Sequence, residues 1–232
     1  MPNLIQVLIQ WLCQKTHGVV KQSSTTAIDV QNLQAVRLKA SDLEDLVTES
    51  RPLQPIRRVR VEGAFLVDFK CDGTVKLTVS GKARDVATLK TYYVEDTLVV
   101  EQKATNAALN KPLVVVLRLP TAPDIAVLGS TTVSMTNIAQ AKLCFEINGS
   151  GDVLAEGMVK SLEVSVQGSG DLNAKELIAD KATVSVKGSG NAKVAVRKEV
   201  IGWVGGSGSL GVHGQPTTRD VKVSGSGSIK FR

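Results

Sequence analysis

A Gly-Ser-Gly triplet recurs five times in the last 84 residues and constrains the fold more than any other feature. The copies begin at residues 149, 168, 188, 206 and 225, so consecutive copies start 19, 20, 18 and 19 residues apart. A flexible glycine-serine linker has no fixed register around its glycines, whereas a stacked structural repeat does. The spacing therefore predicts a structural unit of about 19 residues that repeats along the chain.

The residues around each triplet alternate between apolar and polar side chains. At the positions two and four before the triplet and two and four after it, nineteen of twenty residues are apolar, in a chain that is 43% apolar. The twenty positions form four columns: Phe145, Val164, Val184, Gly202 and Val221; Ile147, Val166, Val186, Val204 and Val223; Val153, Leu172, Ala192, Leu210 and Ile229; Ala155, Ala174, Val194, Val212 and Phe231. A period of two is typical of strands with one buried face.

Each unit is therefore predicted to contain a strand, a Gly-Ser-Gly bend, a second strand and a looser return, such as residues 156–162 or 175–182. Glycine suits the bend because it has no Cβ to oppose positive φ. Since the inward columns persist at a constant repeat length, the units are expected to stack as coils at a strand spacing of about 4.8 Å. The predicted fold class is all-β, a parallel β-helix or β-solenoid. The same register predicts earlier coils at Gly63, Gly81 and Gly129.

The repeat divides the chain into two parts. Residues 1–55 lack it and are predicted to form a short mixed, helical capping segment, and residues 56–232 form the β-helix. Prolines leave open a division of that β-helix into two stacks near residues 120–124. No stretch is long enough and apolar enough to span a bilayer.

Two helices are expected in the N-terminal segment. Glutamines spaced four residues apart leave one broad apolar face on a helix over Leu4–Leu12. Ser41 stands at capping-box spacing from Glu44, and the apolar residues Leu46 and Val47 follow. The first helix is a poor signal peptide because no basic residue precedes it, so a cytoplasmic location stays open.

The charge balance favours acidic partners. Lys and Arg outnumber Asp and Glu by 28 to 22, which gives a net charge of +6. The densest basic cluster contains Arg57, Arg58 and Arg60, which are candidate partner-binding residues or, alternatively, a solvated strand rim. A reader of single-stranded nucleic acid would interleave aromatic rings with such a cluster, and none is there, so no nucleic-acid partner is expected. Trp203 is the other partner-binding candidate, because it occupies a position that is polar in the other copies.

Polar residues follow each triplet and form a further column. Asp152, Asp171 and Asn191 could offer oxygen ligands to a calcium ion. Alternatively, these side chains accept hydrogen bonds from backbone amides of the turn. The column continues as serine in the last two copies, and no metal is expected.

No catalytic residues and no cofactor are expected. Gly206, Gly208 and Gly211 match a dinucleotide-binding pattern by letter, but the residues after them cannot start the helix that such a site requires. The chain has only two histidines, His17 and His213, far apart in the sequence, which makes a Ser/His/Asp arrangement improbable.

The repeats resemble a known bacterial family. The runs Gly149-Ser-Gly-Asp-Val, Gly168-Ser-Gly-Asp-Leu and Gly188-Ser-Gly-Asn-Ala, together with the loop His213-Gly-Gln-Pro216, are similar to those of the auto-transporter adhesin, head GIN domain family. The resemblance covers roughly residues 57–232. It implies a right-handed parallel β-helix, an extracytoplasmic location in the periplasm or at the cell surface, and an adhesive role without catalytic residues.

The sequence leaves three alternative functions for this protein. The first is a non-enzymatic β-helix that binds a cell-surface glycan or protein. The second is a structural β-helix of bactofilin type, which forms homo-oligomers end to end through the edges of its β-helix. The third is a polysaccharide lyase, which would need calcium on the column of Asp152, Asp171 and Asn191.

Overall fold

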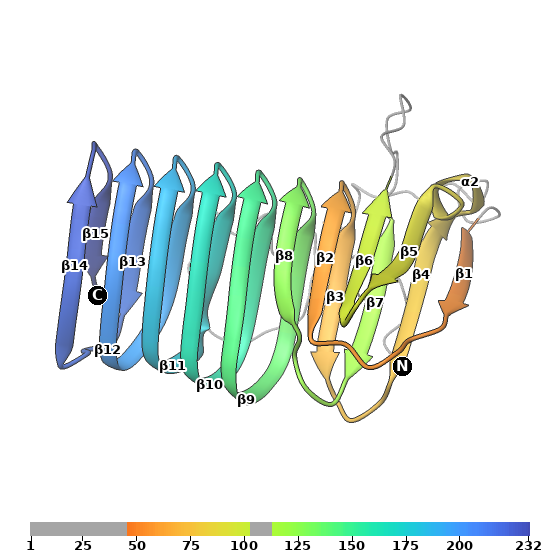
Figure 1. The fold of residues 1–232 in the computed structure, drawn as a ribbon, viewed down its shortest axis with the longest axis horizontal. Helices are drawn as coiled ribbons and strands as arrows, with labels where there is room; N and C mark the ends of the chain where they lie inside the picture. Colours follow the sequence, from red (N-terminus) through yellow and green to blue (C-terminus); the bar gives the residue numbers. More distant parts are fainter. Residues whose placement is uncertain (1–45, 103–112) are drawn as a thin grey trace, which may run out of the picture. The chain divides into compact units, whose positions relative to one another are not determined.

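The chain forms a β-solenoid. The computed structural model describes residues 46–102 and 113–232, almost all of them in strands (Figure 1). The strands form one 15-stranded sheet wound through about five turns. In Figure 1 the nearer strands rise while the chain advances to the left and the farther strands descend, so the winding is right-handed. The fold class predicted from the repeat is confirmed. Within the described ranges, no helix is long and apolar enough to cross a membrane.

Four long bent strands form the regular part of the solenoid. They are β9 (Thr132–Gly149), β10 (Asp152–Gly168), β11 (Asp171–Gly188) and β12 (Asn191–Gly206). They pair in parallel, and the first glycines of successive triplets lie side by side. The returns predicted as loose segments are in fact continuous strand, because irregularities in register, such as the one between Leu154 and Glu156, let each strand bend without leaving its neighbour.

The solenoid has two broad faces. We call the face nearer the viewer in Figure 1 the front face and the other the back face. The front face contains the second halves of β9 to β12 with β14 (Thr218–Ser224), β8 (Asp124–Gly129), β2 (Arg58–Gly63), β6 (Thr97–Gln102) and β5 (Leu89–Val94). The back face contains the first halves of the long strands with β13 (Ser209–His213), β15 (Ser228–Phe231), β3 (Leu66–Cys71), β7 (Val114–Leu119), β4 (Lys76–Lys82) and β1 (Leu46–Arg51).

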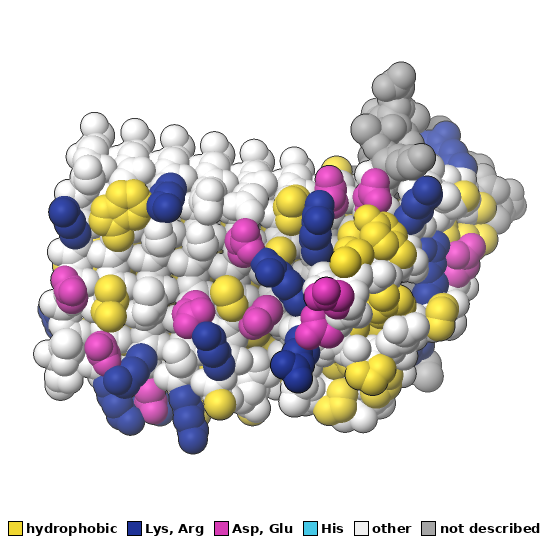
Figure 2. All heavy atoms as spheres, viewed as in Figure 1, with side chains coloured by type: hydrophobic (Ala, Val, Ile, Leu, Met, Phe, Trp, Pro, Cys, Tyr) yellow, Lys and Arg dark blue, Asp and Glu magenta, His cyan; other side chains and the backbone are white. Residues whose placement is uncertain are grey.

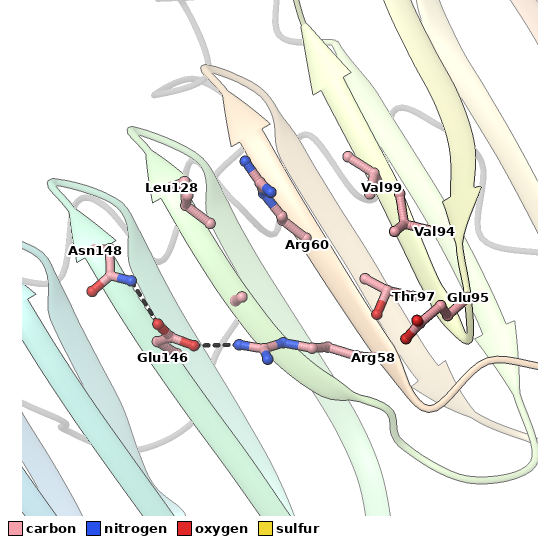
Figure 3. Close-up of a pocket in the computed structure, with 10 residues that line it drawn as sticks. Arg58, Arg60, Val94, Glu95, Thr97, Val99, Leu128, Glu146 and Asn148 are labelled. Carbon is pink, nitrogen blue, oxygen red and sulfur yellow. Dashed lines mark hydrogen bonds and ion pairs between the residues drawn. The ribbon is translucent and has the colours of Figure 1, made fainter.

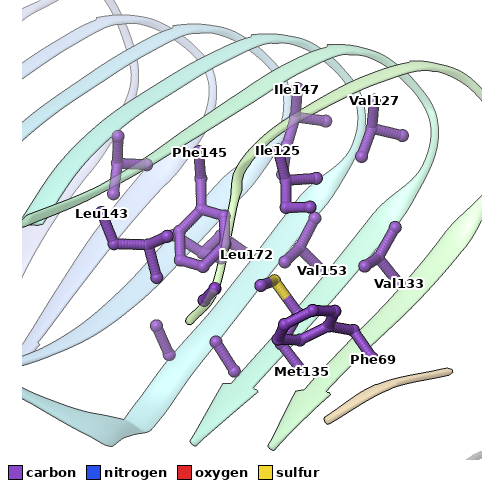
Figure 4. Close-up of a cluster of buried hydrophobic side chains, with 14 of the residues drawn as sticks. Phe69, Ile125, Val127, Val133, Met135, Leu143, Phe145, Ile147, Val153 and Leu172 are labelled. Atoms are coloured by element: carbon purple, nitrogen blue, oxygen red, sulfur yellow. The ribbon is translucent and has the colours of Figure 1, made fainter. Parts of the chain in front are cut away.

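The core lies between the two faces and contains the predicted apolar columns. Every column member in β9 to β13 is buried, and Phe145 is fully enclosed among aliphatic side chains (Figure 4). Only the column residues of the last copy, on β14 and β15, are half-buried or exposed. Gly202, the exception in sequence, has no room for a side chain, because a Cβ there would lie 2.9 Å from Leu210 Cδ2. The leucine therefore fills the space that the glycine leaves.

The Gly-Ser-Gly bends join each coil to the one before it. The carbonyl of Gly168 accepts hydrogen bonds from the N–H groups of both Ser189 and Gly190, at 2.9 and 3.0 Å. Gly188 has φ of +131°, which a residue with a Cβ rarely adopts. Gly190 is required for another reason: a Cβ there would lie 2.2 Å from Gly170 O in the coil below. The two glycines of the triplet thus meet different physical demands.

The coils at the other end do not stack in sequence order. β2 pairs with β6 on one side and β8 on the other, and β3 lies between β7 and β9. The first coil in sequence is therefore inserted between two later ones, and residues 120–123 connect β7 to β8 past it. The prediction of a coil at Gly81 is wrong: Gly81 lies in β4, which runs antiparallel to β7. Gly63 and Gly129 do stack on each other.

This end is closed by antiparallel strands and a short helical turn, α2 (Ala83–Val86). β1 pairs antiparallel with β4, so the helix expected after Ser41 is wrong for Leu46 and Val47. The helix expected over Leu4–Leu12 lies outside the described residues. The guanidinium of Arg51 donates hydrogen bonds to Leu89 O at 2.8 Å and Val86 O at 3.4 Å. One side chain therefore links the back-face strand β1 to the front-face strand β5.

Substitution of the second glycine of a bend is expected to destabilise the fold. In Gly190→Ala, the new methyl group would overlap backbone of the neighbouring coil, which cannot move independently. We expect a loss of about 1–3 kcal/mol in the free energy of unfolding, measured by chemical denaturation. The matched control is Gly211→Ala, where the nearest atom to a Cβ is Lys193 Cγ at 3.6 Å. Equal stability of the two variants would contradict the close-packed bend.

Removal of the Arg51 side chain is expected to loosen the capped end. Its hydrogen bonds to carbonyls are charge-assisted and largely shielded from water, since the side chain is 16% exposed. Arg51→Ala should cost about 1.5–3 kcal/mol and raise hydrogen exchange in β1 and β5. Arg57→Ala is the control, because the Arg57 side chain is 88% exposed and should contribute little. Unchanged exchange in β1 would refute the link.

Candidate functional site

The outward side chains of the front face form three columns across the strands. The middle column contains Tyr92, Val99, Arg60, Ala126, Glu146, Ser165, Ser185, Trp203 and Lys222, in order from β5 to β14. Strand pairing holds each neighbour about 4.8 Å away. Figure 2 shows this face, with charged side chains around β2 and β8 and again along the lower edge toward β14. Two parts of this surface are candidates for binding.

The first candidate is a shallow hollow around β2, called here the arginine groove (Figure 3). It has a volume of about 370 Å³ and contains two of the predicted residues, Arg58 and Arg60. Its other lining residues are Val94, Glu95, Thr97, Val99, Ala126, Leu128, Glu146 and Asn148. Strands from three different stretches of sequence therefore contribute to one surface hollow.

The arginine groove is nearly neutral because its arginines are paired. Arg58 forms an ion pair with Glu146, whose other carboxylate oxygen accepts a hydrogen bond from Asn148 Nδ2 at 2.7 Å. Arg60 Nη2 lies 2.9 Å from Glu62 Oε2. Arg57 lies outside the groove, 3.6 Å from Asp96. The basic cluster seen in the sequence is therefore largely compensated in the fold.

The second candidate lies around Trp203 on β12, called here the tryptophan patch. Its indole ring reaches over Gly205, since a Cβ on that glycine would be 2.4 Å from the ring atoms Cη2 and Cζ2. Lys187 Nζ is 5.4 Å from the ring centroid, within range of a cation–π interaction. On the opposite side, Lys222 of β14 is the direct strand neighbour of Trp203. Figure 2 shows an apolar side chain between two basic ones at this end of the face.

The lysines of the tryptophan patch differ from others nearby. Lys142 and Lys181 each pair with a glutamate, Glu163 and Glu199, and the hydrogen bond raises the pKa of each of these lysines. Among residues 46–102 and 113–232, neither Lys187 nor Lys222 makes an ion pair. The tryptophan patch therefore presents positive charge that the solenoid does not compensate.

The polar column after the triplets lies at the start of the back-face strands. Asp171 Oδ1 accepts hydrogen bonds from Asn191 N at 2.8 Å and from Asn191 Nδ2 at 2.9 Å. Ser209 Oγ donates to Asn191 Oδ1 at 2.6 Å. Asp152 lies on β10, one strand before Asp171. The side-chain oxygens of Asp171 and Asn191 thus accept hydrogen bonds from neighbouring groups of the protein. The described part of the chain has no cluster of three or more acidic, histidine or cysteine ligands.

The thiols in the described ranges are free and half-buried. Burial raises the pKa of both Cys71 and Cys144, with smaller contributions from Asp72 and Asp124 respectively. A raised pKa keeps a thiol protonated at neutral pH, which disfavours nucleophilic chemistry. Cys13 lies outside the described residues.

The structure brings together only some of the predicted binding residues. Arg58, Arg60 and Trp203 share the front face, but five strand spacings, about 24 Å, separate β2 from β12. Sequence reasoning missed Lys187 and Glu146 as neighbours of these residues. Their positions relative to the triplets could have identified them, because residues at equal distances from successive triplets lie side by side in the stack.

The comparisons with known proteins agree with this architecture. Residues 56–216 match the family described as putative auto-transporter adhesin, head GIN domain. The crystal structure of a putative adhesin from Bacteroides fragilis is similar over 82% of this chain and 98% of that one, with 20% identity and a TM-score of 0.67. A putative lipid binding protein from Parabacteroides distasonis covers 82% of this chain and 97% of its own, with 17% identity and a TM-score of 0.46.

A putative adhesin from Parabacteroides merdae covers the same shares, at 13% identity and a TM-score of 0.46. Among curated proteins, none matches this sequence. The Bacteroides fragilis structure supports the fold, and the family model spans more than half of the residues. With its Gly-Ser-Gly coils and its flat outward columns, the chain belongs to the putative auto-transporter adhesin, head GIN domain family.

Proposed function

We propose that this protein is a non-enzymatic adhesin-type module of the cell surface or periplasm, which binds a glycan or protein partner through its front face. The observation that carries the proposal is the long continuous face of parallel strands, on which side chains of equal offset form regular columns. A partner that is itself extended can contact many strands of such a face at once. Membership of an adhesin family agrees with this use.

The rigidity of the face supports a binding role. The bends at Gly149, Gly168 and Gly188 are each joined to the next by paired backbone hydrogen bonds, such as those from Ser207 N and Gly208 N to Gly188 O, both 2.9 Å. Side chains on such a frame are already positioned before the partner arrives, so little conformational entropy is lost on binding. The open arginine groove also suits an extended partner better than an enclosed small molecule.

The chemistry of the described side chains favours binding over catalysis. The two thiols have raised pKa values. The lyase alternative needs calcium on a column in which Asp171 and Asn191 already hydrogen-bond each other. Membership of a family described as putative adhesins adds support.

The ends of the solenoid favour a discrete module over a polymer. Assembly of bactofilin type needs an accessible parallel strand edge at each end. At the β14–β15 edge Val223 is 42% exposed, which favours addition of a strand. At the other end β4 and β5 run antiparallel to their neighbours, and Arg51 links β1 to β5. A parallel stack has no matching edge there among the described strands.

A substitution in the middle of the front face should impair adhesion. Ser185→Glu places a negatively charged side chain in the middle column, and Asn173→Glu places the same side chain on the back face of the same strand, β11. The full chain should be retained on arrays of bacterial-surface polysaccharides and extracellular proteins. We expect Ser185→Glu to weaken retention about tenfold, a change of about 1.4 kcal/mol, and Asn173→Glu to leave it unchanged. Equal retention of both variants would contradict a front-face site.

The polymer alternative predicts a different hydrodynamic behaviour. Sedimentation velocity over a hundredfold range of protein concentration should give one small species if the protein is a discrete module. Growth of the sedimentation coefficient with concentration would instead indicate end-to-end assembly. In that case Val223→Lys, at the exposed edge, should abolish the growth, because like charges on an edge strand oppose pairing.

A further inference from the structure

We propose that the tryptophan patch binds an acidic saccharide, with a carboxylate-bearing sugar ring stacked on Trp203 and its carboxylate between Lys187 and Lys222. This inference rests on the proposed function, because it names the chemistry of the partner that the front face takes. It is carried by the geometry of the ring, the uncompensated charges and the polar groups around them.

The ring of Trp203 is held in an orientation that suits stacking. Gly205 lets it lie against the sheet, where any larger residue would collide with Cη2 and Cζ2 at 2.4 Å. Trp203 is half-buried, and Lys187 Nζ lies over its ring, 5.4 Å from the centroid, so a sugar that stacks there would move this ammonium aside, toward the carboxylate of the sugar. The negative face of an indole attracts the weakly positive C–H groups of a sugar ring. A flat, fixed ring offers this contact at little entropic cost.

The charges beside the ring select an anion. Lys187 and Lys222 stand on β11 and β14, the two strands that flank β12. Two strand spacings, about 9.6 Å, separate these strands, which leaves room for one sugar ring over the indole. Neither lysine has an acidic partner in the described part of the chain, in contrast to Lys142, Lys181 and Lys198. A bound carboxylate would supply the missing counter-charge.

Uncharged polar groups surround these three residues. Ser185 is the strand neighbour of Trp203, and Ser224 is the strand neighbour of Gly205. Gln167 lies beside Lys187 on β10. Hydroxyl and amide groups can both donate and accept hydrogen bonds, as the hydroxyls of a sugar do. The patch thus combines one stacking ring, two cations and neutral polar groups.

The same features disfavour nucleic acid. Binding of single strands depends on several aromatic rings that stack successive bases, and Trp203 is the one aromatic residue of the front columns on β9 to β14. A sugar ring stacked on the indole needs only one aromatic side chain, which the patch has.

Tryptophan fluorescence gives a direct test. The chain has two tryptophans, Trp11 and Trp203, so in the full-length Trp11→Phe variant the emission reports Trp203 alone. Titration with polygalacturonate should change this emission and saturate, and the affinity should fall as NaCl is raised. Fully methyl-esterified polygalacturonate is the matched ligand control, since it has the same sugar backbone without the charge.

Charge removal then tests the two lysines. The double substitution Lys187→Gln and Lys222→Gln in the same background keeps the reporter ring and should weaken polygalacturonate binding at least about tenfold. Lys193→Gln, an exposed lysine on the back-face half of β12, should leave the affinity unchanged. Circular dichroism checks that each variant retains its strand content.

Three results would overturn the inference: equal binding of the esterified polymer, no effect of the double substitution, or tighter binding of oligo-dT than of polygalacturonate. The proposed function fails separately. If polygalacturonate does not bind while Ser185→Glu still weakens retention on the arrays, the acidic-saccharide site is wrong and the front-face adhesin stands. If no partner depends on the front face, both are wrong.

Discussion

The rest of this structure depends on one backbone contact, in which the carbonyl of the first glycine of a bend accepts hydrogen bonds from the next coil: two N–H groups at Gly149, Gly168 and Gly188, and one at Gly206. This contact fixes the register between coils, and every other regularity follows from it. Gly149, Gly168, Gly188 and Gly206 lie side by side, so residues at equal offsets from them also stack. The inward offsets give the aliphatic core, and the outward offsets give the columns of the front face. A side chain at the second glycine would intrude on this contact, which explains why the triplet recurs.

The sequence predicted the fold where structure is periodic and failed where pairing is not local. The columns of Phe145 and Ile147 were predictable because alternation and repeat length together specify parallel stacking. Gly81 was misassigned because Leu77 and Val79 precede it with the same alternation, yet nothing in that pattern encodes an antiparallel partner. Trp203 was identifiable as an exposed departure from the repeat. Its lysine neighbours required the alignment of three coils, and the pairing of Arg58 with Glu146 joins residues 88 positions apart.

The two candidate regions of the front face show that the net charge of a surface region does not follow from the local sequence alone. The basic cluster that dominates the sequence around residue 58 is paired in the fold with glutamate and aspartate side chains of its own and neighbouring segments. The inconspicuous Lys187 and Lys222 keep their charge available beside an aromatic ring. In a stacked repeat, the electrostatic character of a surface depends on the column that a residue joins, and single copies can change without disturbing the core behind them.

The order of the coils has a consequence for how the chain folds. From β9 onward each coil contacts the preceding one, about 19 residues back, and such local contacts form fast. Arg58 of β2, in contrast, pairs with Asp124, 66 residues later, and with Thr97 on its other side. The first coil therefore needs two later segments before both of its edges are covered. The contacts between residues far apart in the sequence lie mainly at the capped end of the solenoid. Once that end has formed, the repeats can add to it one coil after another.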